Sequence, residues 1–332
     1  MNYKIVSNTS EIDKKAWTEF ITQHPNGNFF QTPNLNDFYK YITYYKPITL
    51  FCLNNKNKIS GILLATIQKE KGLIKSKFST RCIIYGGPVL NNNNEEVADL
   101  LLKDLIKTVK NKSIYIEFRN IFDISKQTDI FRKNGFEYKK HFNFILKIND
   151  LDDSFKKLNP SKRRQIRKSI EAGAEICEAK ELNNVSEFYM ILKNLYKTKI
   201  KKPLPDFNFF EKFFYTPELG KYLLIKYENK IIGGIMCALF KDTIYEWYIC
   251  GNDKGHKGIY PSVLATWAPI KYAAENGIKY FDFLGAGSID DYGVREFKSK
   301  FGGELVCYGR YLRINKPLLY KIGKLGLKIM NS

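Results

Sequence analysis

A lysine that follows an aromatic residue near the end of the chain is the side chain with the most evident chemistry. Phe297 and Lys298 come shortly after an apolar segment, residues 280–284, that is broken by Gly285 and Gly287. An apolar strand that ends at glycines and passes into charged residues is a common way for α/β proteins to present a site. A lysine ammonium placed there can stabilise negative charge on a reacting oxygen. The alternative is an exposed lysine in a surface loop.

The elements expected to position Lys298 alternate between strands and helices. Apolar periodicity in the first half predicts a strand hairpin over residues 48–67, an amphipathic helix over 97–109 and a strand over 114–118. The second half has the same order, with strands between residues 222 and 250 and a helix over 262–276 before the strand that leads to Lys298. This pattern predicts an α/β fold.

Two short sequence repeats support a duplication. Residues 57–61 (NKISG) recur as residues 229–233 (NKIIG), and residues 115–118 (YIEF) recur as residues 280–283 (YFDF). Each pair occupies the same place in the order of elements. We therefore interpret the chain as two similar units of ordinary domain size.

Positive charge is in large excess over the whole chain. There are 54 lysines and arginines against 34 acidic residues, a net charge of +20. Residues 156–168 hold seven basic residues and no acid on a predicted helix, and residues 193–202 hold five lysines and no acid. Such an excess favours an anionic partner such as a nucleic acid. A solvated helix face is the alternative for each run taken alone.

Residue usage argues against a metal centre and against export. The six cysteines are scattered without C-x-x-C spacing, and the three histidines lie far from one another. The first residues lack the apolar core of a secretion signal, and no run of eighteen apolar residues occurs. We expect a cytoplasmic protein with neither a metal nor a bound cofactor.

Several motifs together resemble the FemABX family of aminoacyltransferases, which build the peptide cross-bridge of peptidoglycan. Phe281–Gly285 followed by Gly293–Lys298 is the most specific part of this resemblance. The looser parts are Gly27–Gln31, Tyr85–Val89 and Ser161–Lys168.

The resemblance implies two tandem GNAT-like acyltransferase domains with mixed sheets flanked by helices, over residues 1–150 and 151–332. It implies the short form of the family, without a coiled-coil arm. It further implies transfer of an aminoacyl group from aminoacyl-tRNA to an amine of a nucleotide-linked or lipid-linked cell-wall precursor.

The family's catalytic residues can be carried over onto three positions. The Phe-Lys step of the family falls on Phe297 and Lys298, where the lysine is thought to support a charged intermediate. Glu117 matches a family acid that can accept a proton from the attacking amine; a salt bridge with Arg119 or Lys112 is the alternative. The positive charge of the basic helix makes Lys162, Arg163, Arg164, Arg167 and Lys168 the candidates for binding tRNA or another polyanion.

The chain departs from the family at two acceptor-binding positions. Lys40 stands one place later than the family's lysine, and Lys201 stands where relatives carry an arginine. Lysine binds phosphate as a point charge and lacks the two-pronged geometry of arginine. Arg295 and Tyr248 are the further acceptor-binding candidates in the second half.

These departures leave a second reading open, an N-acyltransferase that takes acyl-CoA and acts in surface polysaccharide or envelope synthesis. Residues 251–260 contain glycines and lysines and precede a predicted helix, so their amides can hold a pyrophosphate; a turn that caps the helix is the simpler account. A third hypothesis is that the protein is not an enzyme and binds RNA or a membrane through its basic helices.

The last predicted helix, residues 317–330, is amphipathic and basic. Its leucines and isoleucines alternate with lysines at helical spacing. Such a helix either lies on the inner face of an anionic membrane or docks on the protein's own surface.

Overall fold

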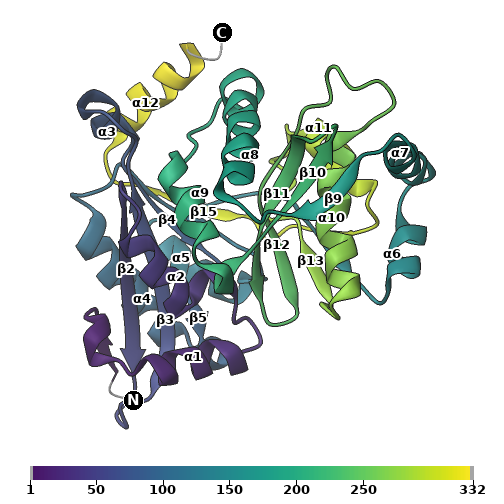
Figure 1. Ribbon diagram of the computed structural model, residues 1–332. Coiled ribbons are helices and arrows are strands. Elements are labelled where there is room, and N and C mark those ends of the chain that lie inside the picture. Colours follow the sequence, from purple (N-terminus) through teal and green to yellow (C-terminus); the bar gives the residue numbers. More distant parts are fainter. Residues whose placement is uncertain (1–2, 330–332) are drawn as a thin grey trace. The chain divides into compact units, whose positions relative to one another are not determined.

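The computed structural model describes residues 3–329 and divides the chain into two compact units (Figure 1). One unit comprises Met1–Lys140 with Tyr308–Ser332, and the other comprises His141–Cys307. The chain therefore passes from the first unit to the second and returns. Each unit is built on its own mixed sheet.

The first unit has a sheet with the strand order β1-β2-β3-β4-β6-β15-β7, and β5 pairs with β3. β4 and β6 run parallel, whereas the other neighbours are antiparallel. The strands are β1 (Lys4–Val6), β2 (Tyr45–Leu53), β3 (Ile59–Gln68), β4 (Arg81–Tyr85), β5 (Val89–Leu90), β6 (Tyr115–Arg119), β7 (Glu137–Lys139) and β15 (Arg310–Ile314).

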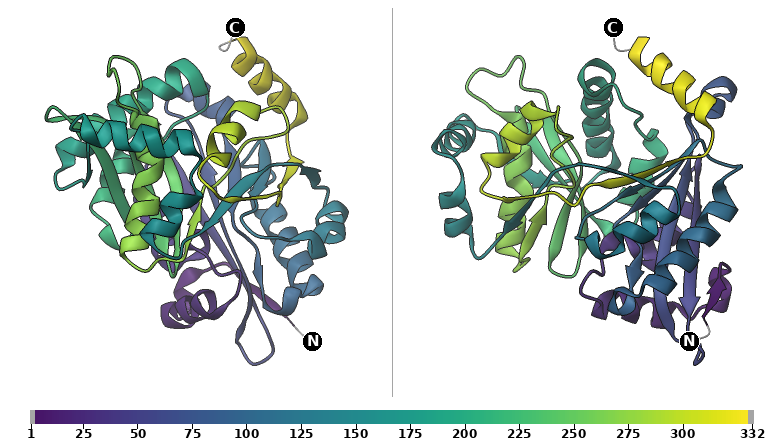
Figure 2. Two further views of the ribbon diagram at one scale, coloured as in Figure 1. Left: turned by 90° about the vertical axis from the view of Figure 1, so that its right-hand side faces the viewer. Right: turned by 180° about the vertical axis from the view of Figure 1, so that it is seen from behind.

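Helix α4 (Glu95–Val109) covers one face of this sheet. Its start is set by Asn94, whose side chain accepts a hydrogen bond from the amide of Val97, and by two glutamates in the first turn. Seen from behind, α4 and α5 lie over the first sheet (Figure 2). The remaining helices are α1 (Lys14–Gln23), α2 (Pro33–Lys40), α3 (Leu73–Ser79), α5 (Thr128–Lys133) and α12 (Pro317–Ile329).

The second unit has a sheet with the strand order β14-β8-β13-β12-β11-β10-β9. β12 and β13 run parallel and the other neighbours are antiparallel. The strands are β8 (Asn143–Lys147), β9 (Glu175–Glu178), β10 (Gly220–Tyr227), β11 (Lys230–Phe240), β12 (Thr243–Gly251), β13 (Tyr280–Asp282) and β14 (Glu304–Val306).

Helices cover both faces of the second sheet. Apolar residues of α10 (Pro261–Glu275) share a core with Leu223 and Ile235. Their strand neighbours Tyr222 and Met236 point the other way, and Tyr222 packs against rings from α8 (Leu182–Leu195) and α9 (Phe207–Phe214). The other helices are α6 (Leu151–Lys157), α7 (Pro160–Glu171) and α11 (Tyr292–Ser299), and α8 continues as a π-helical turn over Tyr196–Ile200.

The two sheets show the duplication and also an exchange of strands. Each has a hairpin, a parallel pair and a covering helix in the same order. However, the last strand of each half lies in the other half's sheet: β8 lies between β13 and β14, and β15 lies between β6 and β7. Each sheet therefore contains one strand from the other half of the sequence.

Because of the strand exchange, the domain boundary in the structure differs from the one predicted from the sequence. The boundary predicted from the sequence lies between residues 150 and 151, with the whole C-terminus in the second domain. In the structure the boundary lies between Lys140 and His141, and Tyr308–Ser332 belongs to the first unit. Glu137–Lys139 and Asn143–Lys147 are close in the sequence, yet they form β7 and β8 in different sheets. A repeat in the sequence does not specify which copy its last strand pairs with.

Lys298 lies on a helix and not in an exposed surface loop. Residues 292–299 form helix α11, which occupies the same place between strands as α5 in the first half. Few apolar residues mark this helix in the sequence, and for this reason its period is hard to detect.

Two fragments test the exchange of strands. Residues 141–307 include β8 and should unfold cooperatively on heating, whereas residues 151–332 lack β8, with its buried Phe144 and Leu146, and should show no cooperative transition. Circular dichroism during thermal unfolding distinguishes the two. A cooperative transition in residues 151–332 that matches the one in residues 141–307 would contradict the strand order described above.

Candidate active site

Lys298 lies near the end of α11 with its ammonium group surrounded by three oxygens. Its Nζ donates to Glu246 Oε1 at 2.6 Å, to the carbonyl oxygen of Phe283 at 2.9 Å and to that of Gly285 at 2.7 Å. The side chains of Lys298 and Glu246 are 11% and 6% exposed. An ammonium has three N–H donors, so each donor has an acceptor. Lys298 is therefore a buried and fully hydrogen-bonded cation.

The two carbonyls are presented by an irregular turn after β13. Leu284 and Gly285 both have positive φ, and Gly287 follows with φ of 85°. A Cβ on Gly287 would lie 2.2 Å from the Cβ of Asp291, so only glycine fits this position. The glycines noted in the sequence thus have a backbone role, since they let the chain turn its carbonyls toward Lys298.

A β-bulge in β12 presents Glu246. Across the pair with β11, Tyr248 lies opposite Met236 while Glu246 lies opposite Cys237, so Trp247 is an extra residue on β12. Trp247 and Tyr248 both pack against Phe209 of α9. Because of the bulge, Glu246 points in a different direction from the rings of Trp247 and Tyr248. Bulges often redirect a side chain in this way beside functional sites.

A second buried carboxylate lies on the neighbouring strand. Asp282 Oδ1 accepts hydrogen bonds from Asn143 Nδ2 and from the amide of Leu284, both at 2.7 Å, and Asn143 Oδ1 accepts from the amide of Gly285 at 2.7 Å. Asn143 comes from β8, the exchanged strand. The exchanged strand therefore supports the same turn that binds Lys298.

Burial raises the pKa of both carboxyls. The pKa of Glu246 is raised because burial outweighs the opposing effects of Lys298, and Oε2 of Glu246 is buried with no hydrogen-bond partner among the described residues. Burial raises the pKa of Asp282 to about 6, against its hydrogen bonds with Asn143 and Leu284. One ammonium thus lies beside two buried acids, and Asp282 keeps its proton to a higher pH than an ordinary aspartate does.

Three residues of this site, Glu246, Asp282 and Asn143, are not among those predicted from the sequence. The signal that was available is an acid in the middle of an apolar strand, in the segments YEWY and YFDF. Aspartate and glutamate are rarely buried without a partner, so such acids mark a site for a buried cation.

Phe297 and Lys162 lie together. The Nζ of Lys162 is 4.5 Å from the centre of the Phe297 ring and 5.9 Å from that of Phe301, and Lys162 is only 7% exposed. Lys162 therefore joins α7 to α11 through a cation–π contact and is not on the surface. Burial also lowers the pKa of Lys162.

The rest of the basic helix faces outward. Arg164, Arg167 and Lys168 are exposed, with the Arg167 guanidinium 5.3 Å from the centre of the Phe155 ring. Arg163 is half-buried and donates to the carbonyl oxygen of Lys156 at 2.7 Å. Of the five tRNA-binding candidates, three thus present their charge to solvent.

Glu117 belongs to the first unit and is held by two arginines. Its Oε2 accepts from Arg119 Nε and its Oε1 accepts from Arg310 Nη1, both at 2.9 Å. Although burial opposes this, the charges of and hydrogen bonds from Arg119 and Arg310 lower the pKa of Glu117 to about 2. A carboxylate this acidic is a poor proton acceptor, so the geometry favours the salt-bridge alternative.

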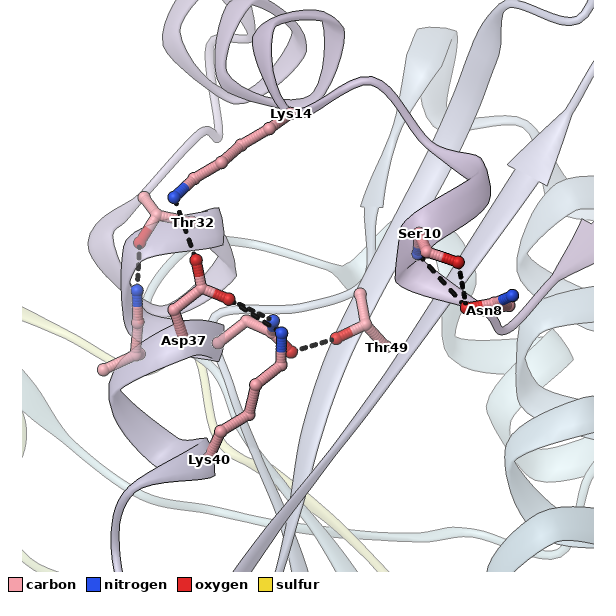
Figure 3. A network of polar contacts seen from close by, with 9 residues as sticks. Asn8, Ser10, Lys14, Thr32, Asp37, Lys40 and Thr49 are labelled. Carbon is pink, nitrogen blue, oxygen red and sulfur yellow. Dashed lines mark hydrogen bonds and ion pairs between the residues drawn. The ribbon is translucent and has the colours of Figure 1, made fainter.

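The four acceptor-binding candidates lie in different surroundings. Lys40 closes α2 in the first unit and pairs with Asp37, which also binds Lys14 (Figure 3). In the second unit, Lys201 has positive φ after the π-helical turn, and Tyr248 lies among the rings of α9.

Arg295, the fourth acceptor-binding candidate, lies one turn before Lys298 on α11. It donates to the carbonyl oxygens of Ser288 and Ile289 and stacks over Phe142. Arg295 therefore braces the loop that leads into α11.

The glycine-containing loop before α10 ends in a side-chain cap. Asp253 accepts hydrogen bonds from the amide of Ser262 at 2.9 Å and from its hydroxyl at 2.6 Å. The carboxylate thus accepts the hydrogen bond of the amide at the start of α10. If the donor were acyl-CoA, its pyrophosphate would be expected at this amide. The cap is the account that this geometry favours.

Comparisons with known proteins agree with this fold. The model of the FemAB family matches residues 220–326, a segment that contains Glu246, Asp282 and Lys298. The solved structure of FemX covers 97% of this chain and 99% of its own, with a TM-score of 0.70 and 15% identity. No curated protein matches the sequence.

Two further solved structures share the fold at lower similarity. L-PGS from Bacillus licheniformis covers 94% of this chain and 96% of its own, with a TM-score of 0.56 and 14% identity. A tandem GNAT protein from the clavulanic acid biosynthesis pathway covers 95% and 99%, with a TM-score of 0.60 and 9% identity. The family match agrees with the resemblance to FemABX over residues 220–326, and the shared fold confirms the prediction of two GNAT-like domains.

Removing the ammonium tests the buried ion pair. Lys298→Met leaves Glu246 as an uncompensated buried charge, which should lower the free energy of unfolding by about 3–5 kcal/mol. The double variant Lys298→Met/Glu246→Leu should be more stable than Lys298→Met alone. Urea unfolding provides both values.

Lys300→Met is the matched control, because Lys300 forms a more exposed ion pair with Glu296 on the same helix. Its expected cost is below about 1 kcal/mol. Equal small losses for Lys298→Met and Lys300→Met would disprove a buried, fully bonded Lys298.

The raised pKa of Asp282 predicts how stability depends on pH. An aspartate in the unfolded chain titrates near pH ~4, whereas folded Asp282, with its pKa raised to about 6, keeps its proton to higher pH. The folded state binds more protons in this range, so the contribution of Asp282 stabilises below about pH 4 and is lost as pH rises through 6.

Asp282→Asn should therefore be more stable than the parent at pH 7.5, by up to about 3 kcal/mol, with the difference shrinking toward pH 5. Urea unfolding at the two pH values measures this, and Asp290→Asn, at an exposed position of the same loop, should show no such difference. An Asp282→Asn variant that is less stable at both pH values would contradict the raised pKa.

Proposed function

We propose that this FemAB-type acyltransferase moves an aminoacyl group from aminoacyl-tRNA to an amine of a peptidoglycan precursor, in the cytoplasm. The observation that carries the proposal is the buried ammonium of Lys298, which lies within the segment that matches the FemAB family. The family's chemistry needs a fixed positive charge beside an ester carbonyl, and Lys298 supplies one.

The reaction forms one bond and breaks one. The neutral amine of the acceptor attacks the carbonyl carbon of the aminoacyl ester, the C–N bond forms, and negative charge collects on the carbonyl oxygen. The C–O bond to the tRNA ribose then breaks, and the proton lost by the amine leaves with the ribose oxygen. No residue of the chain needs to form a covalent intermediate.

In this scheme Lys298 exchanges one of its hydrogen-bond acceptors, a backbone carbonyl, for the oxyanion of the reacting ester. The ammonium turns one N–H from the carbonyl of Phe283 or Gly285 to the developing oxyanion, while Glu246 keeps it in place. The exchange replaces a neutral acceptor with a charged one, so the new hydrogen bond is stronger in the transition state than in the ground state. The contact between Phe297 and Lys162 joins α11 to α7.

Two observations favour tRNA over acyl-CoA as the donor. Arg164, Arg167 and Lys168 present an exposed basic row on α7, as a nucleic-acid backbone requires. Asp253 places a carboxylate on the helix N-terminus where a pyrophosphate would compete with it. Repulsion between these anions disfavours the bound acyl-CoA.

For the acceptor we propose a nucleotide-linked or lipid-linked precursor whose phosphates pair with basic side chains. Lys40, Lys201 and Arg295 are the candidates for these contacts, and Tyr248 is the candidate for a ring or hydroxyl contact. Each single lysine provides one point charge, so each contact contributes modestly.

A transfer assay with two labelled donors distinguishes a transferase that uses aminoacyl-tRNA from one that uses acyl-CoA. The purified protein is incubated with a nucleotide-linked cell-wall precursor and with either labelled aminoacyl-tRNA or labelled acetyl-CoA. We expect label to move only from aminoacyl-tRNA. In the Lys298→Met variant, measured at a temperature where it is folded, kcat should fall about 10²–10³-fold, and Lys300→Met should retain it.

The donor-binding part has its own control. Arg164→Ala/Arg167→Ala/Lys168→Ala should raise the KM for aminoacyl-tRNA and reduce the slope of log affinity against log salt by about two. Removal of the same number of positive charges at and just after α4, in Lys103→Ala/Lys107→Ala/Lys110→Ala, should change neither. Label that moves only from acetyl-CoA, or transfer that is unchanged by Lys298→Met, would overturn the proposal.

A further inference from the structure

One side of the C-terminal helix α12 packs on the first unit. The ring of Tyr320 meets that of Tyr115 at a centroid distance of 5.6 Å, edge to face. A Cβ on Gly323 would lie 3.3 Å from the carbonyl oxygen of Phe78 in α3, so the two backbones approach closely there. Figure 1 shows α12 beside α3. The helix therefore packs on α3 through Gly323 and on the start of β6 through Tyr320.

The opposite side of α12 carries exposed apolar side chains. Leu318, Ile322 and Leu325 are 78%, 50% and 59% exposed. Their spacing of four and three residues places them in one row along the helix. We call these three residues the apolar row. Docking on the protein's own surface thus accounts for only one side of the helix.

Positive charge borders the apolar row. Lys321 and Lys324 are exposed and repeat along its flank. No acidic residue follows Glu304 in the sequence. Next to α12, α3 adds the exposed Lys77 and Phe78, the latter 37% exposed. The same surface is therefore both apolar and basic.

We propose that this surface, made by α12 with the end of α3, docks the protein on an anionic membrane. The apolar row enters the boundary between headgroups and acyl chains, and Lys321, Lys324 and Lys77 face the lipid phosphates. None of the described helices is long and apolar enough to cross a membrane, so the contact is peripheral.

Charge complementarity selects this occupant over two others. A second copy of the chain would bring an equally basic surface against this one, and like charges repel. An RNA would pair with the lysines but would leave the apolar row against its charged backbone. An anionic bilayer matches the charge and takes up the apolar side chains.

The expected contact is weak and reversible. A lysine near an anionic leaflet contributes about fivefold in affinity at ordinary salt. Three partly inserted aliphatic side chains add to this. Docking requires neither the donor nor the acceptor of the transfer reaction, so the two proposals can fail separately.

Vesicle flotation tests the proposal with the full chain. We expect the protein to float with vesicles of phosphatidylcholine and phosphatidylglycerol and not with phosphatidylcholine alone, and raising the salt should weaken the binding. Leu318→Ser/Ile322→Ser/Leu325→Ser should reduce binding at least about tenfold, and Lys321→Gln/Lys324→Gln should reduce it about tenfold or more.

Matched variants on other surfaces control for charge and for loss of apolar area. Lys107→Gln/Lys110→Gln removes the same charge at the C-terminal end of α4, and Met190→Ser removes an apolar side chain that is 60% exposed on α8. Both should float like the parent. Each variant should fold, because the altered side chains are exposed. Circular dichroism checks this.

Three outcomes would overturn the proposal. The first is no flotation with anionic vesicles. The second is flotation that the α12 variants and the α4 control reduce equally, which indicates a general charge effect. The third is unchanged flotation in the serine variant together with loss of self-association in light scattering or loss of RNA binding, which assigns the surface to a second copy or to RNA.

Discussion

The buried ammonium of Lys298 is the interaction on which the second unit depends. A lysine can be buried only if its charge and its three donors are satisfied, and here Glu246 and two backbone carbonyls do this. This requirement accounts for the irregular features around it. The bulge in β12 directs Glu246 toward the ammonium, and the positive φ of Leu284 and Gly285 directs the carbonyls. Lys298 is thus a structural cation before any substrate arrives.

Strand exchange connects this site to the whole chain. Asn143, which hydrogen-bonds both Asp282 and the turn at Gly285, comes from β8, a strand contributed by the first half of the sequence. The last strand of the second half, β15, in turn completes the first sheet and brings Arg310 to Glu117. A duplicated unit has therefore become one in which neither half completes its own sheet.

Much of the fold could be predicted because local pattern determines it. The hairpins, the helix over residues 97–109 and the basic helix have strong periodicity or clear ends, and Phe297 and Lys298 mark the candidate site. The partners of Lys298 could not be predicted in the same way. A one-residue bulge determines which face of the sheet Glu246 lies on. Helix α11 has too few apolar residues for its period to be detected. A duplicated sequence does not indicate which of the two sheets β8 joins. Lys162 illustrates the same limit, since its place in a basic run gives no hint that it is buried against Phe297.

The central claim is that Lys298 is a fixed ammonium with all three donors bonded. Nitrogen-15 NMR of the lysine side chains tests it most directly, because a buried, hydrogen-bonded ammonium exchanges its protons with water slowly enough to be observed near neutral pH, whereas an exposed one does not. We predict a lysine ammonium signal that is absent from Lys298→Arg and that weakens through faster exchange in Glu246→Gln. A Lys298 ammonium that exchanges as fast as that of Lys300 would contradict the account.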